Sequence, residues 1–210
     1  MREHFITTAR TARYFTLGAP AHAGEIWFVC HGYAQLAARF LERFRPIEAE
    51  GRCIVAPEGL SRFYLTEAPA ERRVGAAWMT SEDRLHEIDD YVRYLDAVYS
   101  SVAPQKATIT ALGFSQGTAT VARWAALGSS HVDRLILWGG EVPPDLDLKR
   151  LRVAELRLVY GTRDQYFTPK IVAANERRLQ EHGIRYELTS FDGGHEIDAP
   201  TLLRLAGPRV

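Results

Sequence analysis

The sequence has few cysteines and no long hydrophobic run. Only two cysteines, Cys30 and Cys53, occur among 210 residues, which is too few for a disulfide scaffold. Each lies in an apolar run typical of a strand (WFVC and CIVA), so we expect two buried thiols, with pairing between them left open. No stretch of about 18 apolar residues occurs, so no membrane span is predicted. The charged N-terminal segment has no apolar stretch like that of a signal peptide, and we expect a cytoplasmic protein.

The sequence also lacks an excess of charge and several common motifs. It has 26 basic and 26 acidic residues, so nothing indicates a nucleic-acid partner, which usually requires a basic surface. His86-Glu87 and His195-Glu196 each begin an H-E-x-x-H pattern, but positions 90 and 199 are Asp and Ala. A helical zinc site of that type is therefore excluded. Neither a phosphate-binding loop motif nor a dinucleotide-binding glycine pattern occurs.

What the sequence does contain is an alternation of short apolar runs with longer amphipathic ones. The length fits a single domain over residues 1–210. Strands alternating with helices predict an α/β fold with a mainly parallel central sheet covered on both faces. Ligands of such sheets bind beyond the carboxyl ends of the strands. The predicted strands are Arg13–Leu17, Glu25–Cys30, Cys53–Ala56, Ala107–Phe114, Arg134–Trp138, Leu156–Tyr160 and Arg185–Phe191.

Helices are predicted in most of the intervening segments. Gln35–Glu50 is one, and Glu82–Ser100, with Ser81 as its N-cap, is the clearest. Pro57–Thr80 has no obvious periodicity, as in a long functional loop. Three further helices are expected from Ser115 to Gly128, from Thr168-Pro169 to about Gly183, and after Pro200. In the helix Glu82–Ser100, the apolar residues are spaced so that they form one buried stripe: Leu85, Ile88, Val92, Leu95 and Tyr99.

The strand ending at Phe114 leads directly into Gly-Phe-Ser-Gln-Gly at residues 113–117. This matches G-x-S-x-G, a sharp strand-to-helix turn that lifts a serine hydroxyl above the sheet. Glycines are needed on either side because side chains there would collide with neighbouring backbone. The motif predicts Ser115 as a nucleophile. An ordinary strand–turn–helix with a capping serine is the alternative interpretation.

A nucleophilic serine needs a base and an orienting carboxylate. His195 follows the last strand in Asp-Gly-Gly-His, so we predict that it is the base. Asp164 follows the strand Leu156–Tyr160 and gives the order Ser, Asp, His described for α/β-hydrolases. Asp145 and Asp147 also follow a strand and remain competitors. Asp192 is close in sequence to the histidine and Asp133 lies at the wrong end of its strand.

The remaining catalytic element is an oxyanion hole, a pair of N–H donors for the developing negative charge. The strand Glu25–Cys30 leads into His31-Gly32-Tyr33, where a glycine permits the backbone to turn its amides towards the serine. We expect the donors to be the backbone N–H groups of Tyr33 and Gln116. His31 is expected to hold the loop through a hydrogen bond.

These segments together resemble the phospholipase/carboxylesterase family, which includes acyl-protein thioesterases and bacterial carboxylesterases. The similarity rests on GFSQG at 113–117, His-Gly at 31–32, Ala-Pro-Glu-Gly at 56–59, Gly-Thr-Arg-Asp at 161–164 and Gly-Gly-His at 193–195. It covers about residues 25–200. The resemblance implies a compact α/β-hydrolase without a large cap domain, a Ser-Asp-His triad, no metal and no organic cofactor.

Two segments depart from the family pattern. The family often has Gly-Asp after Leu-His-Gly, whereas here Cys-His-Gly at 30–32 is followed by Tyr33-Ala34. The segment that often reads Ser-Trp-Phe-Asp in the family is Ala-Trp-Met-Thr at 77–80. Both lie near the expected acyl pocket and leave the substrate open. The residues expected to line this pocket, unless they pack in loops or in the core, are Phe63, Tyr64, Leu65, Trp78 and Met79.

The sequence thus predicts a serine carboxylesterase that cleaves small-molecule esters or thioesters of small or medium acyl chains through an acyl-enzyme. The alternatives are a non-catalytic ligand-binding protein with the same fold, or a lysophospholipase, peptidase or lactonase with the same triad. Whether the chain is a monomer or a homodimer stays open.

Overall fold

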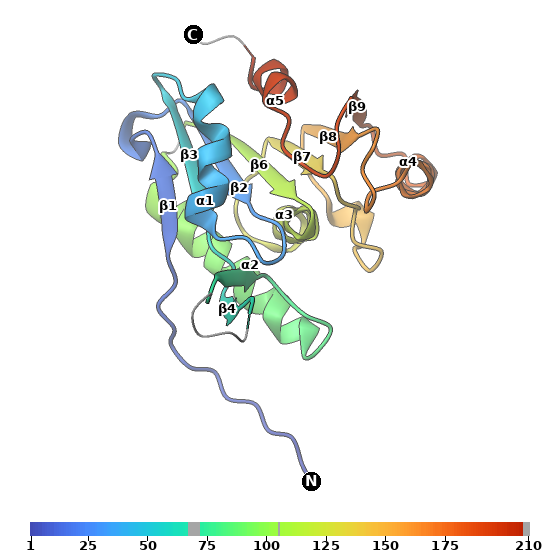
Figure 1. Cartoon of the computed structure of the whole chain (residues 1–210). Helices are drawn as coiled ribbons and strands as arrows, with labels where there is room; N and C mark the ends of the chain where they lie inside the picture. The colour runs from blue at the N-terminus through green and yellow to red at the C-terminus, as the bar shows by residue number, and fades with distance from the viewer. Residues whose placement is uncertain (67–71, 105, 208–210) are drawn as a thin grey trace.

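The computed structural model describes residues 1–66, 72–104 and 106–207. A seven-stranded sheet, with the order β1-β3-β2-β6-β7-β8-β9, forms the centre and is flanked by helices (Figure 1). Only β1 is antiparallel to its neighbour, and all other adjacent strands are parallel. The predicted α/β class and mainly parallel sheet are therefore confirmed.

All seven predicted strands are present, with ends that differ from prediction by two residues at most. They are β1 (Tyr14–Leu17), β2 (Glu25–Cys30), β3 (Arg52–Pro57), β6 (Thr108–Phe114), β7 (Arg134–Trp138), β8 (Glu155–Gly161) and β9 (Glu187–Phe191). The inner strands are almost wholly buried. That burial explains their continuous apolar runs, which parallel strands covered on both faces require.

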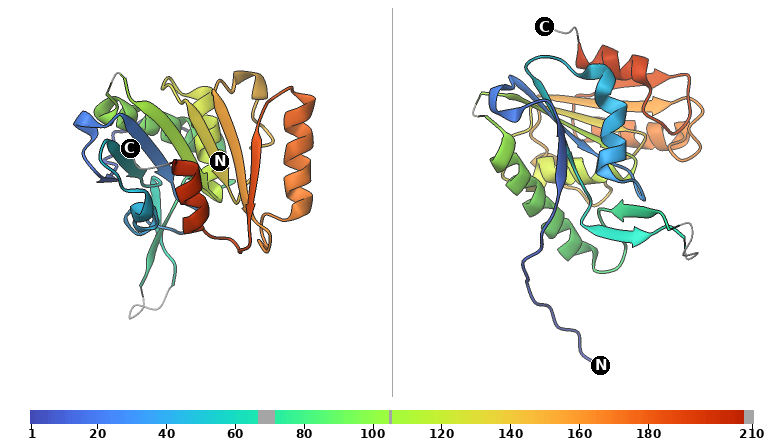
Figure 2. Two further views of the ribbon diagram at one scale, coloured as in Figure 1. Left: turned by 90° about the horizontal axis from the view of Figure 1, so that it is seen from above. Right: turned by 60° about the vertical axis from the view of Figure 1, so that its left-hand side comes forward.

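The helices divide into two layers, one on each face of the sheet (Figure 2). Along β2, Ile26, Phe28 and Cys30 face one layer, while Trp27 and Val29 face the other. The first layer contains α2 (Arg84–Val102), α3 (Gln116–Leu127) and α4 (Pro169–Glu181). The second contains α1 (Ala37–Leu41), η2 (Glu42–Ile47) and α5 (Ala199–Ala206). Two short 3₁₀ helices, η1 (Pro20–His22) and η4 (Leu148–Arg150), precede β2 and β8.

Both cysteines are buried free thiols, Cys30 in β2 and Cys53 in β3. The register pairs Cys53 with Ile26, so the two cysteines are not opposite one another. Burial raises the pKa of each thiol, and that of Cys53 to about 11.

The predicted helix Gln35–Glu50 is wrong in extent. Its α-helical part is α1, only five residues long, and the chain continues as the 3₁₀ helix η2 with Pro46 inside it. Proline has no N–H to donate and disfavours an α conformation in the residue before it. The segment is therefore wound as a tighter 3₁₀ helix, which ends at Ile47.

The second long helix begins later than predicted, at Arg84, and Ser81 does not cap it. The residue before the helix is Asp83, in a left-handed conformation and without a side-chain cap. Instead, the Glu87 carboxylate accepts hydrogen bonds from the Thr80 N–H and hydroxyl, at 2.6 and 3.1 Å. Leu85, predicted on the buried stripe, is 69% exposed, because the first turn of the helix extends beyond the sheet (Figure 1).

The segment Pro57–Thr80 contains a hairpin that periodicity did not predict. Its strands, β4 (Ser61–Tyr64) and β5 (Val74–Ala77), pair in an antiparallel register outside the main sheet. β5 is rich in Gly and Ala, so its sequence has no alternating apolar pattern. The hairpin is small, and the described residues contain no large cap domain.

Asp96 joins α2 to the carboxyl end of α3. Its carboxylate accepts hydrogen bonds from Trp124 Nε1 at 2.8 Å and from the N–H and hydroxyl groups of Ser129 and Ser130. Burial opposes ionisation of the carboxyl, but the hydrogen bonds from Ser129, Ser130 and Trp124 outweigh burial and lower the pKa of Asp96. The group is therefore ionised at neutral pH and holds the helix layer that supports α3.

Replacing this carboxylate should destabilise the protein. Asp96→Ala leaves its donors without an acceptor and should lower the free energy of unfolding by about 2 kcal/mol at pH 7, measured by urea denaturation. Because the pKa is lowered in the folded state, this contribution should be present above the unfolded pKa of about 3.9 and lost as the pH falls through the folded pKa. Asp89→Ala, on the exposed side of the same helix, is the control. Equal stability of the two variants would contradict the assignment.

Candidate active site

Ser115 lies at the turn between β6 and α3, with φ at 53° and ψ at −118°. This conformation is costly for a residue with a Cβ, by about 1–3 kcal/mol, and persists only where neighbouring structure enforces it. Here the Ser115 N–H donates to Trp138 O at 2.9 Å, while its carbonyl accepts from the Thr118 N–H and hydroxyl. The backbone of the predicted nucleophile is thus fixed from two sides.

The glycines of the G-x-S-x-G motif are required by close backbone contacts. A Cβ on Gly113 would lie 2.1 Å from the carbonyl oxygen of Gly117, and a Cβ on Gly117 would lie 2.2 Å from that of Cys30. No side chain can be placed at such distances without moving main chain. These contacts bring the start of α3 onto the end of β2, where the His-Gly-Tyr segment begins.

His195 and Asp164 are brought together at the same sheet edge. Asp164 follows β8 and is 5% exposed, and its Oδ2 lies 2.7 Å from His195 Nδ1. The other oxygen, Oδ1, accepts the N–H groups of Tyr166 and Phe167 at 2.8 and 2.9 Å. A carboxylate accepts from Nδ1–H, which leaves the Nε2 lone pair of His195 free to take a proton.

The imidazole lies beside the serine turn. Its ring is 4.8 Å from the ring of Phe114, the residue before Ser115, and a Cβ on Gly139 would be 3.2 Å from it. Gly139 follows Trp138, which binds the Ser115 N–H. No hydrogen bond joins the Ser115 hydroxyl to His195 in the residues described. Such contacts are often long without substrate and shorten in the Michaelis complex.

The competing aspartates are engaged elsewhere. Asp145 forms ion pairs with Arg84 and Arg123, at 3.1 and 2.7 Å. Asp147 accepts the Lys149 N–H, Asp133 accepts the Ile109 N–H, and Asp192 pairs with Arg163. Of the five candidates, only Asp164 forms a hydrogen bond with the imidazole within the described residues.

The loop after β2 lies against the serine. A Cβ on Gly32 would be 3.1 Å from the Cβ of Ser115. The Gly32 N–H donates to Gln35 Oε1, and the Gln35 N–H donates to Gly32 O. The Ala34 N–H donates to Ala76 O. By contrast, the N–H groups of Tyr33 and Gln116 have no acceptor within the described parts of the chain. The two predicted oxyanion donors are therefore the amides that remain free.

Ala34 and Gln35 shape the loop that carries Tyr33. Ala34 has a left-handed φ of 64°, which alanine tolerates at a modest cost. Gln35 accepts the Gly32 N–H through Oε1 at 2.8 Å. The loop conformation is thus supported by a hydrogen bond from a side chain of the loop itself.

His31 has a structural part in the same loop. It is fully buried, its Nδ1 donates to Gly32 O at 2.8 Å, and its Nε2 accepts the Gly59 N–H at 3.0 Å. Burial lowers the pKa of His31, which favours this neutral ring. Both ring nitrogens are therefore occupied, which matches the expectation that His31 holds the loop.

The side chain of Gln116 forms two hydrogen bonds with the segment after β5, which holds the turn that carries the Gln116 N–H. Its Oε1 accepts the Trp78 N–H at 3.0 Å and its Nε2 donates to Met79 O at 2.8 Å. Trp78 Nε1 in turn donates to His31 O at 2.8 Å. One short segment thereby holds both the Gln116 turn and the loop that carries Tyr33.

The five residues predicted to line an acyl pocket are in different environments. Trp78 is buried in the core, and Met79 packs against that core. Phe63 stacks on Tyr33 with ring centroids 5.3 Å apart, and Tyr64 and Leu65 are exposed on the hairpin. Of the five, Tyr64 and Leu65 are the most exposed.

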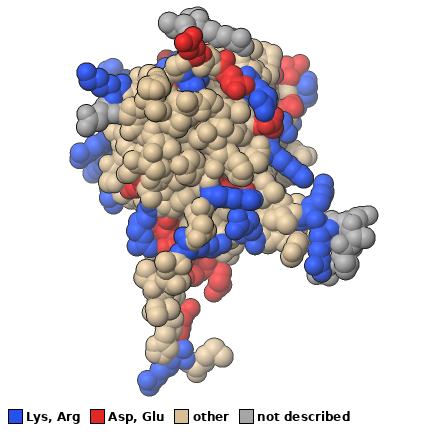
Figure 3. Space-filling view, turned by 90° about the vertical axis from the view of Figure 1, so that its left-hand side faces the viewer, with Lys and Arg blue, Asp and Glu red and all other residues tan. Residues whose placement is uncertain are grey.

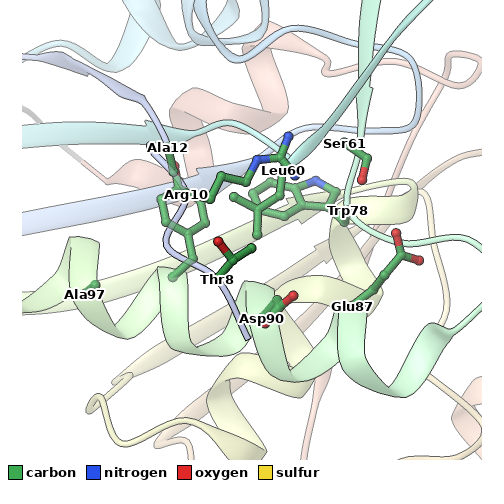
Figure 4. A pocket seen from close by; sticks show the side chains of 10 residues that line it. Thr8, Arg10, Ala12, Leu60, Ser61, Trp78, Glu87, Asp90 and Ala97 are labelled. Carbon is green, nitrogen blue, oxygen red and sulfur yellow. The ribbon is translucent and has the colours of Figure 1, made fainter. Parts of the chain in front are cut away.

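Trp78 also lines a cavity of about 460 Å³ between the N-terminal segment and α2 (Figure 4). None of Ser115, Asp164 and His195 lines this cavity. Its walls include Thr8 and Arg10 on one side, and Glu87 and Asp90 on the other (Figure 4). The cavity is therefore separate from the serine site.

Sequence reasoning missed three residues of the site. The side chains of Gln35 and Gln116 were not assigned, although a glutamine beside each predicted donor was a signal that the donors are held. Tyr166 was also missed. Its ring meets His195 edge-on at 5.0 Å, and its position two residues after Asp164 was the available signal.

Neither a metal cluster nor a membrane segment is present in the residues described. No three His, Cys, Asp or Glu side chains there are grouped to hold a metal ion. No helix of the described chain is long and apolar enough to cross a membrane.

The backbone contact at Gly117 can be tested directly. Gly117→Ala places a methyl group against the Cys30 carbonyl and should destabilise the fold by at least the upper end of the ~1–3 kcal/mol range for overpacking. Gly24→Ala is the matched control, because a Cβ there meets nothing within 4 Å. Thermal unfolding of both variants is the measurement. A Gly117→Ala protein as stable as Gly24→Ala would contradict the close contact.

Comparisons with known proteins identify the fold. No protein-family model and no curated protein sequence matches the chain. Among solved structures, Zea mays acyl-protein thioesterase 2 is similar over 93% of this chain and 96% of its own, with a TM-score of 0.73 and 15% identity. A carboxylesterase from Mesorhizobium loti matches over 94% and 95%, with a TM-score of 0.70 and 22% identity. Esterase PE8 matches over 94% and 97%, with a TM-score of 0.68 and 18% identity. The chain therefore has the α/β-hydrolase fold of the acyl-protein thioesterase and carboxylesterase type.

Proposed function

We propose that this protein is a serine hydrolase that cleaves carboxylic esters or thioesters of small or medium acyl chains through an acyl-enzyme. The observation that carries the proposal is the 2.7 Å contact between His195 Nδ1 and the nearly buried Asp164 carboxylate. That contact lies at the same sheet edge as the strained turn of Ser115 and two unpaired amides. No single one of these features would distinguish a hydrolase from an ordinary turn.

In the first half of the reaction, His195 Nε2 takes the proton of the Ser115 hydroxyl as its oxygen attacks the acyl carbon. Asp164 holds the imidazole in the required tautomer and stabilises the imidazolium that forms. The new C–O bond converts the carbonyl oxygen into an oxyanion. The N–H groups of Tyr33 and Gln116 bind this oxyanion, which is the charge that develops only towards the transition state.

Collapse of the oxyanion breaks the bond to the leaving group. The alcohol or thiol receives the proton from His195, and the acyl group remains on Ser115. Water then attacks the acyl-enzyme by the same route, with His195 again taking and returning a proton, and the carboxylic acid is released.

The hairpin supports an apolar acyl group. The Tyr33–Phe63 stack joins the oxyanion loop to β4, and Tyr64 and Leu65 extend the exposed apolar surface along it. An acyl chain placed there would run from the serine along the hairpin. Trp78 and Met79 contribute by binding the Gln116 side chain through their backbone.

Similar structures agree with this reaction class, since they are named acyl-protein thioesterase, esterase and carboxylesterase. A lysophospholipase, peptidase or lactonase would use the same triad, and no contact in the described residues favours one of them over an esterase. A purely binding protein would not need a histidine oriented by a buried carboxylate.

Removing the nucleophile should abolish hydrolysis. Ser115→Ala should lower kcat/KM for p-nitrophenyl butyrate by roughly 10³-fold or more, because no other group can form the acyl-enzyme. Ser190→Ala, exposed in β9, is the control and should keep the wild-type rate. Wild-type rates in Ser115→Ala would overturn the proposal.

Gln116 should act as a positioning residue through its side chain. Gln116→Met keeps the backbone N–H but removes both hydrogen bonds to residues 78 and 79. Loss of a whole oxyanion donor costs about 10²–10³-fold in kcat, so a loosened donor should lower kcat by roughly 10-fold and leave KM almost unchanged.

The control for this variant is Gln180→Met. It removes the hydrogen bond that Gln180, on the surface of α4, donates to the Tyr186 hydroxyl. Steady-state kinetics and melting temperatures of both variants are compared. If Gln116→Met raises KM alone, or changes kcat only in proportion to lost folded protein, the positioning role is wrong.

A further inference from the structure

A groove lined by arginines lies between α1 and the β4–β5 hairpin. It has a volume of about 410 Å³. Arg39 of α1, Arg43 of η2 and Arg73 next to β5 line it, together with Ala34 and Gln35 of the oxyanion loop. Figure 3 shows several Lys and Arg side chains, with a few Asp and Glu among them, on one side of the molecule. The groove therefore combines positive charge with direct contact to the catalytic loop.

The three arginines differ from their neighbours in having no acidic partner among the residues that the structure describes. Arg45, in the same helix as Arg43, pairs with Glu42 and Glu48. Arg13, which precedes β1, and Arg62 of β4 both pair with the buried Glu58. By contrast, no ion pair or hydrogen bond of the Arg39, Arg43 and Arg73 side chains occurs within the described residues.

The other walls of the groove favour an anion. No carboxylate of the described residues lines it, and five of its lining residues are apolar: Ala34, Leu36, Phe40, Leu65 and Val74. Three cations that face one groove raise the positive potential there and attract an anion. The planar guanidinium group binds carboxylate and phosphate oxygens with paired N–H donors. Three such groups around one groove suit an ordered anion better than a solvated surface.

The groove is also placed to bind part of a molecule that reacts at Ser115. Ala34 and Gln35, which line it, follow Tyr33 directly in the chain. Ser115, His195 and Tyr33 do not line the groove themselves, so the groove and the serine site meet only through this loop. A substrate must therefore extend across the loop to reach both, which an acyl chain of medium length or a long leaving group can do.

We infer that this groove binds a carboxylate or phosphate group of the substrate, so that the preferred substrates are anionic esters or thioesters. The inference rests on the proposed function of Ser115, and it names a substrate class within it. The shared chemistry is an oxyanion held by Arg39, Arg43 and Arg73. Its source is either an acyl chain that ends in a carboxylate or a leaving group that carries phosphates.

Two matched pairs of substrates separate these sources. For the carboxylate, mono-4-nitrophenyl suberate is compared with neutral 4-nitrophenyl octanoate, which has the same number of carbons in its acyl chain. For the phosphate, octanoyl-coenzyme A is compared with octanoyl-N-acetylcysteamine. The wild-type protein should prefer the anionic member of at least one pair by roughly 10-fold in kcat/KM, and added salt should reduce that preference.

The triple variant Arg39→Gln/Arg43→Gln/Arg73→Gln should abolish this preference. The control is Lys149→Gln/Arg150→Gln/Arg152→Gln, which removes the same charge from a second basic groove. That groove contains His131 and Val132, which precede β7, and so lies at the opposite edge of the sheet from Ser115. The control should keep the preference, whereas equal effects of the two triple variants would show general attraction by charge and overturn the inference.

Binding to Ser115→Ala distinguishes failure of the groove from failure of the proposed function. Calorimetry with suberate and with octanoyl-coenzyme A should detect binding that the groove triple weakens roughly 10-fold, whether or not the wild-type protein hydrolyses any ester. If neither ligand binds, or if the groove triple binds them as well as its parent, the groove is not an anion site. Loss of hydrolysis with binding intact would instead contradict the role of Ser115. If the triple variant of the groove arginines unfolds at a lower temperature than the wild-type protein, the single variants Arg39→Gln and Arg73→Gln replace it.

Discussion

The backbone conformation of Ser115 is the constraint on which the rest of the site depends. At a φ of 53°, the chain turns from β6 into α3 so sharply that main-chain segments meet where side chains would normally separate them. The turn is enforced by hydrogen bonds to Trp138 and Thr118 and permitted by glycines at 113 and 117. The cost of this strained backbone is offset by the packing of two layers of helices against the sheet.

The same turn decides which amides remain available. Most N–H groups of the loop after β2 are bound within the loop or by β5, and those of Tyr33 and Gln116 are left unpaired. Two glutamines fix this arrangement, one by accepting the Gly32 N–H and one by binding the backbone of residues 78 and 79. Trp78 connects both halves through its bond to His31 O. The two amides that we propose as oxyanion donors are thus held by a continuous set of hydrogen bonds.

Much of the fold could be predicted, because buried parallel strands give apolar runs that are easy to detect. β2 and β7 were predicted with their observed bounds, and the residues predicted after β8 and β9, Asp164 and His195, do lie in contact. The hairpin could not be predicted, because Gly and Ala in β5 carry no periodic signal and its partner is short. Pro46 shortened α1 in a way that apolar spacing alone did not indicate.

In the candidate site, too, some residues could be predicted from the sequence and others could not. Ser115, Asp164 and His195 belong to short motifs at strand ends, so chain order was enough to predict them. The side chains of Gln35, Gln116 and Tyr166 act through contacts between distant segments, and only the three-dimensional structure provides these. Ala34 illustrates the limit most clearly, since a left-handed φ at an alanine cannot be inferred from residue type.

The most direct test of the central claim is to locate a covalent adduct. The protein is treated with diethyl p-nitrophenyl phosphate, which phosphorylates activated serines, and then digested and mapped by mass spectrometry. We predict a single adduct on the peptide that carries Ser115, absent in Ser115→Ala and formed much more slowly in Asp164→Asn. A folded protein that forms no adduct, or one modified at another residue, would contradict the assignment of Ser115 as an activated nucleophile.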